Sequence, residues 1–270
     1  MSHIEPFRVG RVEVEVVCEG FAPLPIDDEC PGQGVDWGAE RARHPWSFHG
    51  DLAWPWHVHA FVLRTPAGIA VVDTGVGGFG PYRPWAEHDP AAWGRVDLAE
   101  VRHVVLTHLH ADHAGGAMAG AAARFPNATY HVHPSDWAFF AGTDDEDYVA
   151  RAAMVPLEAA GRLDLAPFDH EVTPGVEVRH SPGHTPGHRS VVVRDAGEAL
   201  LLTGDLLHLP VQAAHPEWPS SHDVDPALGA ASRQLLLFLA RHEGWRVGVS
   251  HFARPLGTAT EHGWRSGPAT

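Results

Sequence analysis

The chain contains no lysine, so all nineteen of its basic residues are arginine, against thirty-four acidic residues. This absence excludes catalysis through a Schiff-base lysine and nucleotide binding through a P-loop lysine. The formal net charge of −15 disfavours nucleic acid as a partner, because contacts to phosphate need a basic face. Any chemistry must therefore come from other side chains.

Cysteine and long apolar runs are also scarce. Cys18 and Cys30 are the two cysteines, too few for a disulfide framework, and neither lies in a metal-ligand spacing. The first residues lack the basic flank and apolar run of a secretory signal, and no stretch approaches the ~20 apolar residues of a membrane span. We expect a cytoplasmic protein with no membrane segment, in which residues 1–270 form one domain.

Histidine is abundant, with twenty-two residues, and its densest group is Thr107–His113, which reads THLHADH. An extended strand points alternate side chains to one side, so His108 and His110 emerge together and can hold one metal ion. Asp112 and His113 follow, next to a turn, and can reach a second ion. Imidazole and carboxylate suit zinc and other first-row divalent metals.

Later motifs offer further ligands at the ends of predicted strands. The Gly- and Pro-rich loop 181–188 contains His184, a third ligand for the first ion, whereas His188 runs into the next strand and is expected beside the ligands. Asp205 follows an apolar strand and could bridge two cations with one oxygen each. His251 ends the last predicted strand and completes the second ion.

Asp73 ends a predicted hairpin at a glycine turn. Its carboxylate could orient a ligand histidine or cap the turn amides that follow, and we favour the first role. Two further histidine pairs, His57 with His59 and His131 with His133, share the spacing of two residues, and no carboxylate follows the first of these pairs. An ordinary strand or pocket role is the preferred interpretation for these four.

Two irregular segments are candidates for the walls of a pocket. Residues 22–56 contain four tryptophans and are interpreted as an ordered lid with an apolar wall, or as rings that cover the sheet. A second pocket loop is expected at 206–224. The candidate pocket residues are Trp54, Trp56, His208 and Gln212.

Between these motifs the sequence predicts several helices. One covers 114–124, rich in alanine, and another begins at Pro134. A third spans 147–162 and is interrupted at Pro156. A long amphipathic helix begins after its cap, Asp225. No pattern is evident in the tail beyond the last predicted strand.

With these ligands assembled, the sequence resembles the metallo-β-lactamase superfamily, whose motifs DTG, THLHADH, SPGHTPGH, TGD and VSH occur in order across residues 73–251. The resemblance implies an α/β fold, an αβ/βα four-layer sandwich with two mixed sheets face to face and helices outside. It implies a binuclear site along one edge. The implied ligands are His108, His110 and His184 for the first ion, Asp112, His113 and His251 for the second, and Asp205 between them.

Within the superfamily the chain looks closest to the lactonase and organophosphate-hydrolase branch. Asp205 argues against β-lactam hydrolysis, and His110 argues against the flavodiiron members. The lack of a basic C-terminal cluster argues against glyoxalase II. Nucleases of the superfamily carry extra domains or basic exosites. Some lactonases use a tyrosine to assist the carbonyl, but Tyr82, Tyr130 and Tyr148 lie in no matching context.

The expected function is metal-dependent hydrolysis, in which a hydroxide bridging two divalent ions attacks an ester or lactone carbonyl. Zinc is the first choice of metal, with iron or manganese as alternatives. Asp112 could carry the proton to the leaving group. Rival functions are phosphotriester or thioester hydrolysis, a persulfide dioxygenase-like reaction on a single iron, and metal-dependent binding without turnover. The expected partner is a small molecule with an apolar portion, and a homodimer is one option for the assembly.

Overall fold

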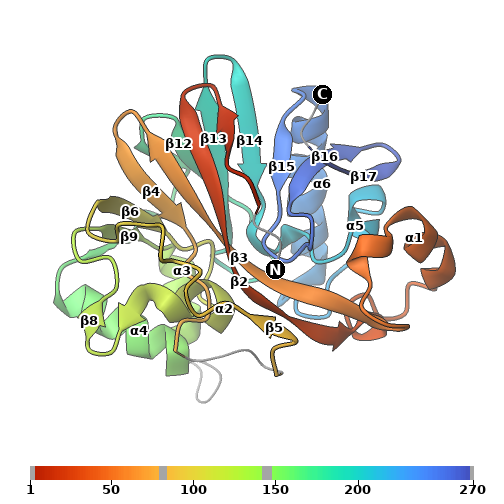
Figure 1. The fold of residues 1–270 in the computed structure, drawn as a ribbon, viewed down its shortest axis with the longest axis horizontal. Coiled ribbons are helices and arrows are strands. Elements are labelled where there is room, and N and C mark those ends of the chain that lie inside the picture. Colours follow the sequence, from red (N-terminus) through yellow and green to blue (C-terminus); the bar gives the residue numbers. More distant parts are fainter. Residues whose placement is uncertain (1–3, 79–83, 142–147, 268–270) are drawn as a thin grey trace.

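The computed structural model describes residues 4–78, 84–141 and 148–267, and Figure 1 shows how they are arranged. Tyr82 and the side chain of Tyr148 lie outside the described part of the chain. No helix in these described ranges combines the length and the apolar character that a membrane span requires.

A long antiparallel pair, β2 (Val12–Pro25) and β3 (Ala53–Thr65), dominates the first sheet. The valines that alternate from Val12 form the start of β2. The predicted hairpin is confirmed, because Phe61 of β3 pairs with Val72 of the next strand. The strand order is β1-β2-β3-β4-β6-β9-β10, with β5 paired to β2. The remaining strands are β1 (Phe7–Val9), β4 (Gly68–Val72), β5 (Glu87–His88), β6 (Val101–Val105), β9 (Thr129–His131) and β10 (Leu163–Asp164).

The second sheet follows the order of the chain from β11 to β17. All of its pairs are antiparallel except β14 with β15, where Leu201 lies opposite Val247. Its last two strands form a hairpin in the tail, where no pattern is evident in the sequence. The strands are β11 (His170–Thr173), β12 (Val176–His180), β13 (Arg189–Asp195), β14 (Glu198–Leu202), β15 (Arg246–Gly248), β16 (Leu256–Thr260) and β17 (Gly263–Ser266).

The two sheets pack face to face and helices cover their outer faces (Figure 1). Between the sheets, Phe61 and Leu63 of β3 join a buried cluster with Val191 and Leu202 of the second sheet. On the outer face of the second sheet, Leu237 of the last long helix packs in another cluster. The predicted four-layer arrangement with mixed sheets is therefore confirmed. The α-helices are α1 (Trp37–Arg43), α2 (Ala111–Ala114), α3 (Pro134–Ala141), α4 (Tyr148–Ala159), α5 (Val211–Ala214) and α6 (Pro226–His242).

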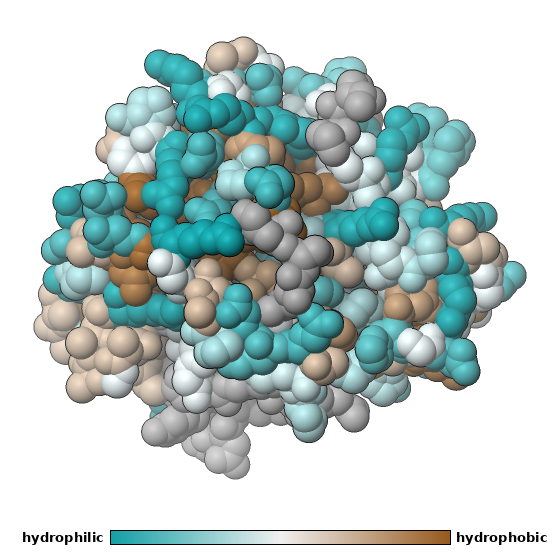
Figure 2. All heavy atoms as spheres, in the orientation of Figure 1, coloured by the Kyte–Doolittle hydropathy of each residue, from teal (hydrophilic) through white to brown (hydrophobic). Residues whose placement is uncertain are grey.

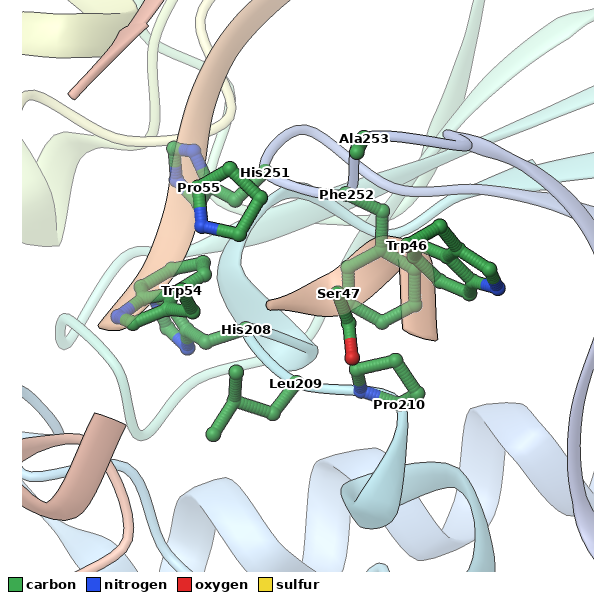
Figure 3. A pocket seen from close by; sticks show the side chains of 10 residues that line it. All are labelled: Trp46, Ser47, Trp54, Pro55, His208, Leu209, Pro210, His251, Phe252 and Ala253. Carbon is green, nitrogen blue, oxygen red and sulfur yellow. The ribbon is translucent and has the colours of Figure 1, made fainter. Parts of the chain in front are cut away.

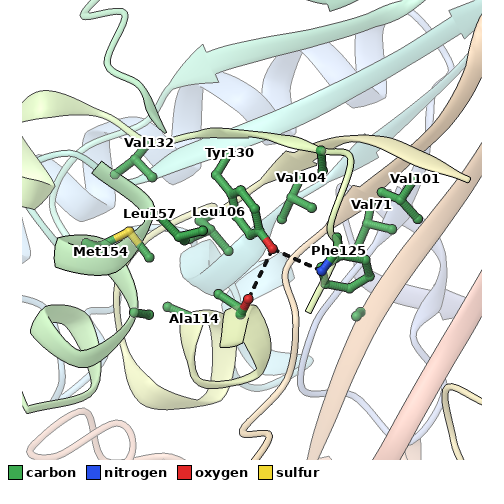
Figure 4. Close-up of a cluster of buried hydrophobic side chains, with 14 of the residues drawn as sticks. Val71, Val101, Val104, Leu106, Ala114, Phe125, Tyr130, Val132, Met154 and Leu157 are labelled. Atoms are coloured by element: carbon green, nitrogen blue, oxygen red, sulfur yellow. Dashed lines mark hydrogen bonds between the residues drawn. The ribbon is translucent and has the colours of Figure 1, made fainter. Parts of the chain in front are cut away.

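The core beside α4 contains Tyr130, one of the three tyrosines (Figure 4). Its hydroxyl donates to the Ala117 carbonyl at 3.0 Å and accepts from the Phe125 amide at 3.2 Å. Burial raises the pKa of this phenol to about 12. Tyr130 therefore serves the packing of the outer face of the first sheet.

The helix predicted for 114–124 is wrong. The structure has α2, which ends at Ala114, then the short 3-10 helix η3 (Gly115–Ala117) and a small hairpin of β7 (Met118–Ala119) and β8 (Ala122–Ala123). Glycines explain the difference, since a Cβ on Gly116 would lie 2.0 Å from the Thr74 carbonyl oxygen. The close contact between the Gly116 backbone and Thr74 therefore determines the local structure. A helix propensity calculated from the alanines of this segment does not include such a contact.

The other predicted helices differ less. Pro156 lies inside α4 and does not interrupt it, because it is exposed and water can solvate the carbonyl that loses its N–H partner. The Asp225 carboxylate accepts from the Leu228 amide at 3.0 Å and caps α6, as predicted. Residues 22–56 are less irregular than expected, since β2 and β3 extend into both ends.

Hydrophilic residues cover much of the described surface on the face shown in Figure 2, and hydrophobic residues show mainly between them. This distribution fits a chain with thirty-four acidic and nineteen basic residues. Long apolar side chains of α6 are exceptions, with Leu235 at 59% and Phe238 at 61% exposure.

Candidate metal centre

Four donor residues converge in a first cluster, at the ends of strands from both sheets. The His110 Nδ1 atom lies 2.8 Å from His108 Nε2 and 3.0 Å from His184 Nε2. The Asp205 Oδ2 atom lies 3.4 Å from His184 Nε2 and 3.8 Å from His108 Nε2. These are separations expected of atoms that share one ion at about 2.0–2.2 Å.

A second cluster contains Asp112, His113 and His251 together with the other oxygen of Asp205. Asp205 Oδ1 lies 3.1 Å from His113 Nε2 and 2.9 Å from His251 Nε2, and Asp112 Oδ2 lies 3.2 and 3.4 Å from the same two nitrogens. His113 Nε2, His251 Nε2 and Asp205 Oδ1 are buried without a hydrogen-bond partner. Buried polar atoms normally have partners, so three such atoms aimed at one another fit a metal ion.

Asp205 joins the two clusters because it presents one oxygen to each. It lies in η4 (Gly204–Leu206), directly after β14. Gly204 has a φ of +54°, and a Cβ there would lie 2.6 Å from His188 Nε2. That nitrogen accepts the Asp205 backbone N–H at 3.0 Å. His188 therefore supports the backbone of Asp205 and does not face either cluster as a donor.

Each histidine of the second cluster is oriented through its outer ring nitrogen. His113 Nδ1 lies 2.7 Å from Asp73 Oδ2, and the hydroxyl and amide of Thr107 donate to the same carboxylate. His251 Nδ1 lies 2.7 Å from the backbone oxygen of His57. Such outer hydrogen bonds fix the tautomer and direction of metal-binding imidazoles. Asp73 also has a φ of +61°, a conformation that few non-glycine residues adopt.

Two positioning carboxylates were not anticipated from the sequence. Asp223 Oδ1 lies 3.3 Å from His184 Nδ1, and Arg233 pairs with the other oxygen at 3.3 Å. Asp136 accepts from the Leu109 amide at 3.0 Å and the Gly187 amide at 2.8 Å, so it ties together the two loops that hold the first cluster. No sequence pattern marks either residue, since acidic side chains are common in loops and in the first turn of a helix.

Burial keeps the imidazoles of the first cluster neutral. It lowers the pKa of His108 well below the usual value and that of His110 to about 3. Neutral imidazole is the form that offers a lone pair to a metal. In the second cluster, burial opposes charge on Asp205, but His113 and His251 hold its pKa well below the usual range. The cluster thus contains ionised carboxylates, which attract cations.

A small, partly open pocket lies beside the second cluster (Figure 3). His251 and His208 lie near Trp54 at one end, and Trp46 lies toward the other. The lining residues are Trp46, Ser47, Trp54, Pro55, His208, Leu209, Pro210, His251, Phe252 and Ala253. Aromatic rings from 22–56 therefore form an apolar wall, as one of the two interpretations of this segment predicts.

Of the predicted pocket residues, two line this cavity and two do not. Trp54 and His208 line it. Trp56 stacks on Trp85 with ring centroids 6.5 Å apart and supports His251 from the side, at 5.6 Å. Gln212 is fully buried, and its Oε1 atom accepts from the His208 amide at 2.8 Å and a neighbouring amide. Gln212 thus shapes the loop from inside, away from a bound molecule.

His208 lies between two acidic groups. Its Nε2 atom is 3.1 Å from Asp205 Oδ2 and its Nδ1 atom is 3.4 Å from Glu29 Oε1. Burial lowers the pKa of His208, but Glu29 and Asp205 outweigh it and raise the value to about 9. The 206–224 loop therefore contacts the cluster directly through this imidazole.

Comparison with known proteins adds a family and a fold. A family model described as the metallo-beta-lactamase superfamily matches residues 53–251. An N-acyl homoserine lactonase of a Bacillus species is 33% identical over 107 residues, which are 39% of this chain and 38% of that protein. The N-acyl homoserine lactonase AttM of Agrobacterium fabrum is 32% identical over 173 residues, 54% of this chain and 63% of that protein. The matched parts are thus less than two thirds of these relatives.

Solved structures resemble the chain over its whole length. The hydrolase AbOPH of the beta lactamase superfamily has a TM-score of 0.83 and 20% identity, covering 100% of this chain and 98% of the other. AidC, described as a dizinc quorum-quenching lactonase in complex with a product, has a TM-score of 0.81 and 19% identity, with the same coverage. At such identities the likeness shows the fold alone.

Proposed function

The chain belongs to the metallo-beta-lactamase superfamily, and from this premise we propose that it is a binuclear metal-dependent hydrolase that opens a lactone or a related ester. The observation that carries the proposal is the pair of clusters that share Asp205. The N-acyl homoserine lactonases among its relatives support a lactone as the substrate.

The proposed ligands follow the two clusters. His108, His110 and His184 hold the first ion, Asp112, His113 and His251 hold the second, and Asp205 lies between them. Zinc is the proposed metal, because imidazole and carboxylate donors suit it and a structural neighbour is described as dizinc. When bound, two such ions lower the pKa of water and polarise a carbonyl oxygen.

The residues of the chain then orient the substrate and move the proton. Asp112 directs Oδ2 toward His113 and His251, so its other oxygen can carry a proton to the alkoxide that leaves when the ester bond breaks. Asp73 and the His57 carbonyl keep the imidazoles of the second cluster in a fixed direction. The products are a carboxylate and an alcohol, which remain joined if the substrate is a lactone.

The cavity beside His251 suggests which part of the substrate is recognised. Its aromatic lining suits an apolar group, and the space inside it is far below the ~300–1,000 Å³ of sites that enclose whole ligands. We therefore assign it to one apolar arm, such as an acyl chain, while the ester lies over the clusters. The proposed partner is a small molecule with such an arm.

A substrate panel tests the proposal. Zinc-loaded protein is assayed with N-acyl homoserine lactones of increasing chain length, aryl esters, phosphotriesters and thioesters. We expect the highest kcat/KM for a lactone, with a rise as a longer acyl chain contacts the aromatic lining of the pocket. Preference for a phosphotriester or a thioester would make that class, and not lactones, the substrate. If no class is hydrolysed in a metal-dependent way, the result would favour metal-dependent binding without turnover.

The oxidoreductase alternative is separated by metal analysis. A persulfide dioxygenase-like enzyme needs one iron in the first cluster, whereas the second cluster is here complete and buried. We expect zinc-like ions in both clusters. A single iron per chain with no second ion in the binuclear centre would overturn the hydrolase.

A further inference from the structure

A second group of metal-binding side chains lies outside the binuclear centre, on the long pair β2 and β3. Cys18 of β2 is the direct cross-strand partner of His59 of β3, and His57 precedes His59 by two residues. Cross-strand partners and residues two apart project from the same face of a sheet. Phe61, two residues further, faces the second sheet. The three side chains therefore share the face between the sheets.

The donor atoms of these residues lie close together. Cys18 Sγ is 3.6 Å from His57 Nδ1, and one donor atom from each of the three residues lies within 4.8 Å of the others. A tetrahedral zinc ion with bonds of about 2.3 Å to sulfur and about 2.0 Å to nitrogen would hold these two atoms about 3.5 Å apart. The pair of Cys18 and His57 therefore already has the spacing of two zinc ligands, and His59 has a donor atom within 4.8 Å of both.

His59 is the strongest indication of a ligand. Its side chain is 1% exposed, and neither ring nitrogen has a hydrogen-bond partner. The carbonyl groups of Val249 and Ser250 face the ring without meeting hydrogen-bond geometry. Backbone carbonyls in such a place commonly receive the outer N–H of a metal-bound imidazole. A buried imidazole that has only these poorly aligned carbonyl groups beside its ring nitrogens is unfavourable, and a metal bond would stabilise it.

We propose that Cys18, His57 and His59 form a third metal site, which takes a borderline or soft ion of the zinc or copper(I) class. One thiolate and two imidazoles are the donors, a set that selects such ions over magnesium or calcium. Binding replaces the thiol proton by the metal, so one proton is released for each ion bound. Because burial raises the pKa of the Cys18 thiol to about 12, the metal has to displace this proton at neutral pH.

The site would also affect the binuclear centre. The backbone oxygen of His57 lies 2.7 Å from His251 Nδ1, and the His59 amide donates to the Ser250 carbonyl at 3.1 Å. An ion held by His57 and His59 would therefore fix the strand against which His251 is oriented. This role does not depend on the substrate or on catalysis.

Cobalt(II) substitution tests the third site directly. The binuclear centre has only nitrogen and oxygen donors, so a sulfur-to-cobalt charge-transfer band in the near ultraviolet can arise only from a cysteine. The chain has two cysteines, and Cys30 lies in a separate buried cluster. We expect the band in cobalt-loaded wild-type protein and in Cys30→Ala, and its loss in Cys18→Ser with one fewer ion bound per chain.

Each outcome decides the proposal. No charge-transfer band in folded, cobalt-saturated wild-type protein would overturn it, as would a band that survives Cys18→Ser and disappears in Cys30→Ala. If Cys18→Ser does not fold, the spectrum of Cys30→Ala decides, because Cys18 is then the sole thiol. If the protein shows the band but hydrolyses no substrate, the third site is supported and only the proposed function is refuted.

Discussion

Asp205 is the residue on which the two clusters depend, because its oxygens face different sets of histidines. The sequence could place it at the end of an apolar strand, next to histidines that recur in known motifs. It also named Asp73, which lies against His113, but it could not reveal the other groups that position the donors. Asp223, Asp136 and the His57 carbonyl reach the site from distant parts of the chain, and no local pattern marks such contacts.

Replacing Asp205 by Asn exchanges one ligand oxygen for a nitrogen that cannot bind a cation. We expect the binuclear centre to bind about one ion fewer and kcat/KM for the best substrate to fall at least ~100-fold. Metal analysis and steady-state kinetics measure both effects. Asp195→Asn, which removes a surface carboxylate paired with Arg11, is the matched control. Full metal content and full activity in Asp205→Asn would refute the bridging role.

Asp223→Asn tests the residue that orients His184. Loss of the ionised acceptor should weaken zinc binding about 10–100-fold, since outer hydrogen bonds of this kind tune ligand direction and basicity. Competition with a chelator measures the affinity. The control variant is Asp225→Asn, two residues further along the chain. Asparagine can still cap α6 at this position, so zinc affinity should be unchanged. Equal affinities in both variants would show that Asp223 does not position the ligand.

At the scale of elements, strand ends and glycine-rich loops determine where the donors lie. The hairpin that ends at Asp73 and the α6 cap were predicted correctly, because a glycine turn and an Asp-Pro start carry local signals. The strands β16 and β17 were not predicted. The prediction from the sequence failed at 114–124, where the backbone of Gly116 packs against another segment. Contacts of this kind depend on the tertiary fold and leave no periodicity in the sequence.

The loop that contains His184 packs on the start of α6 through a glycine. Gly183 has a φ of +134°, and a Cβ would lie 2.0 Å from the Gly229 amide nitrogen. We expect Gly183→Ala to lower the free energy of unfolding by about 2 kcal/mol or more, and to weaken zinc binding. Gly197 also has a positive φ, but a Cβ there would have no close neighbour. Gly197→Ala should therefore lower the free energy of unfolding by only about 1 kcal/mol. Urea unfolding that gives equal losses would contradict the packing argument.

Asp136 makes the loop junction sensitive to pH. Burial raises the pKa of its carboxyl group from 3.8 to about 6. Between these values the folded protein holds a proton that the unfolded chain has lost, so the contribution of Asp136 to stability falls as pH rises through this window. The asparagine of Asp136→Asn cannot titrate. The free energy of unfolding of this variant should therefore lie below that of the wild type by an amount that shrinks from about pH 4 to about pH 6. Urea unfolding at several pH values would disprove this if the difference stays constant or widens.

At the scale of the whole molecule, two sheets bring five separate motifs to one edge of the sandwich. The order of these motifs along the chain was sufficient to predict the layers, and it named the donor residues that lie together in the two clusters. The substrate was not predictable in the same way, because the cavity is built from tryptophans of 22–56 and from the loop after Asp205. These rings carry no periodic signal and meet only in the folded chain.

Removal of metal should destabilise the protein. Both clusters bury carboxylate oxygens beside imidazoles, and three donor atoms of the second cluster have no hydrogen-bond partner. Zinc that binds the folded state alone stabilises it by about 4 kcal/mol at a thousandfold excess over its Kd. We therefore expect a lower Tm after chelation and recovery with zinc but not with magnesium. An unchanged Tm would indicate that the clusters hold no ion in the folded protein.

The most direct measurement is the rate of lactone ring opening as zinc is returned to metal-stripped protein. We expect no turnover of an N-acyl homoserine lactone without metal and restoration of the rate as both clusters fill. Asp205→Asn should stay below about 1% of the wild-type rate at the same zinc concentration. Zinc bound in both clusters with no hydrolysis of any lactone or ester would contradict the assignment as a binuclear metal-dependent hydrolase.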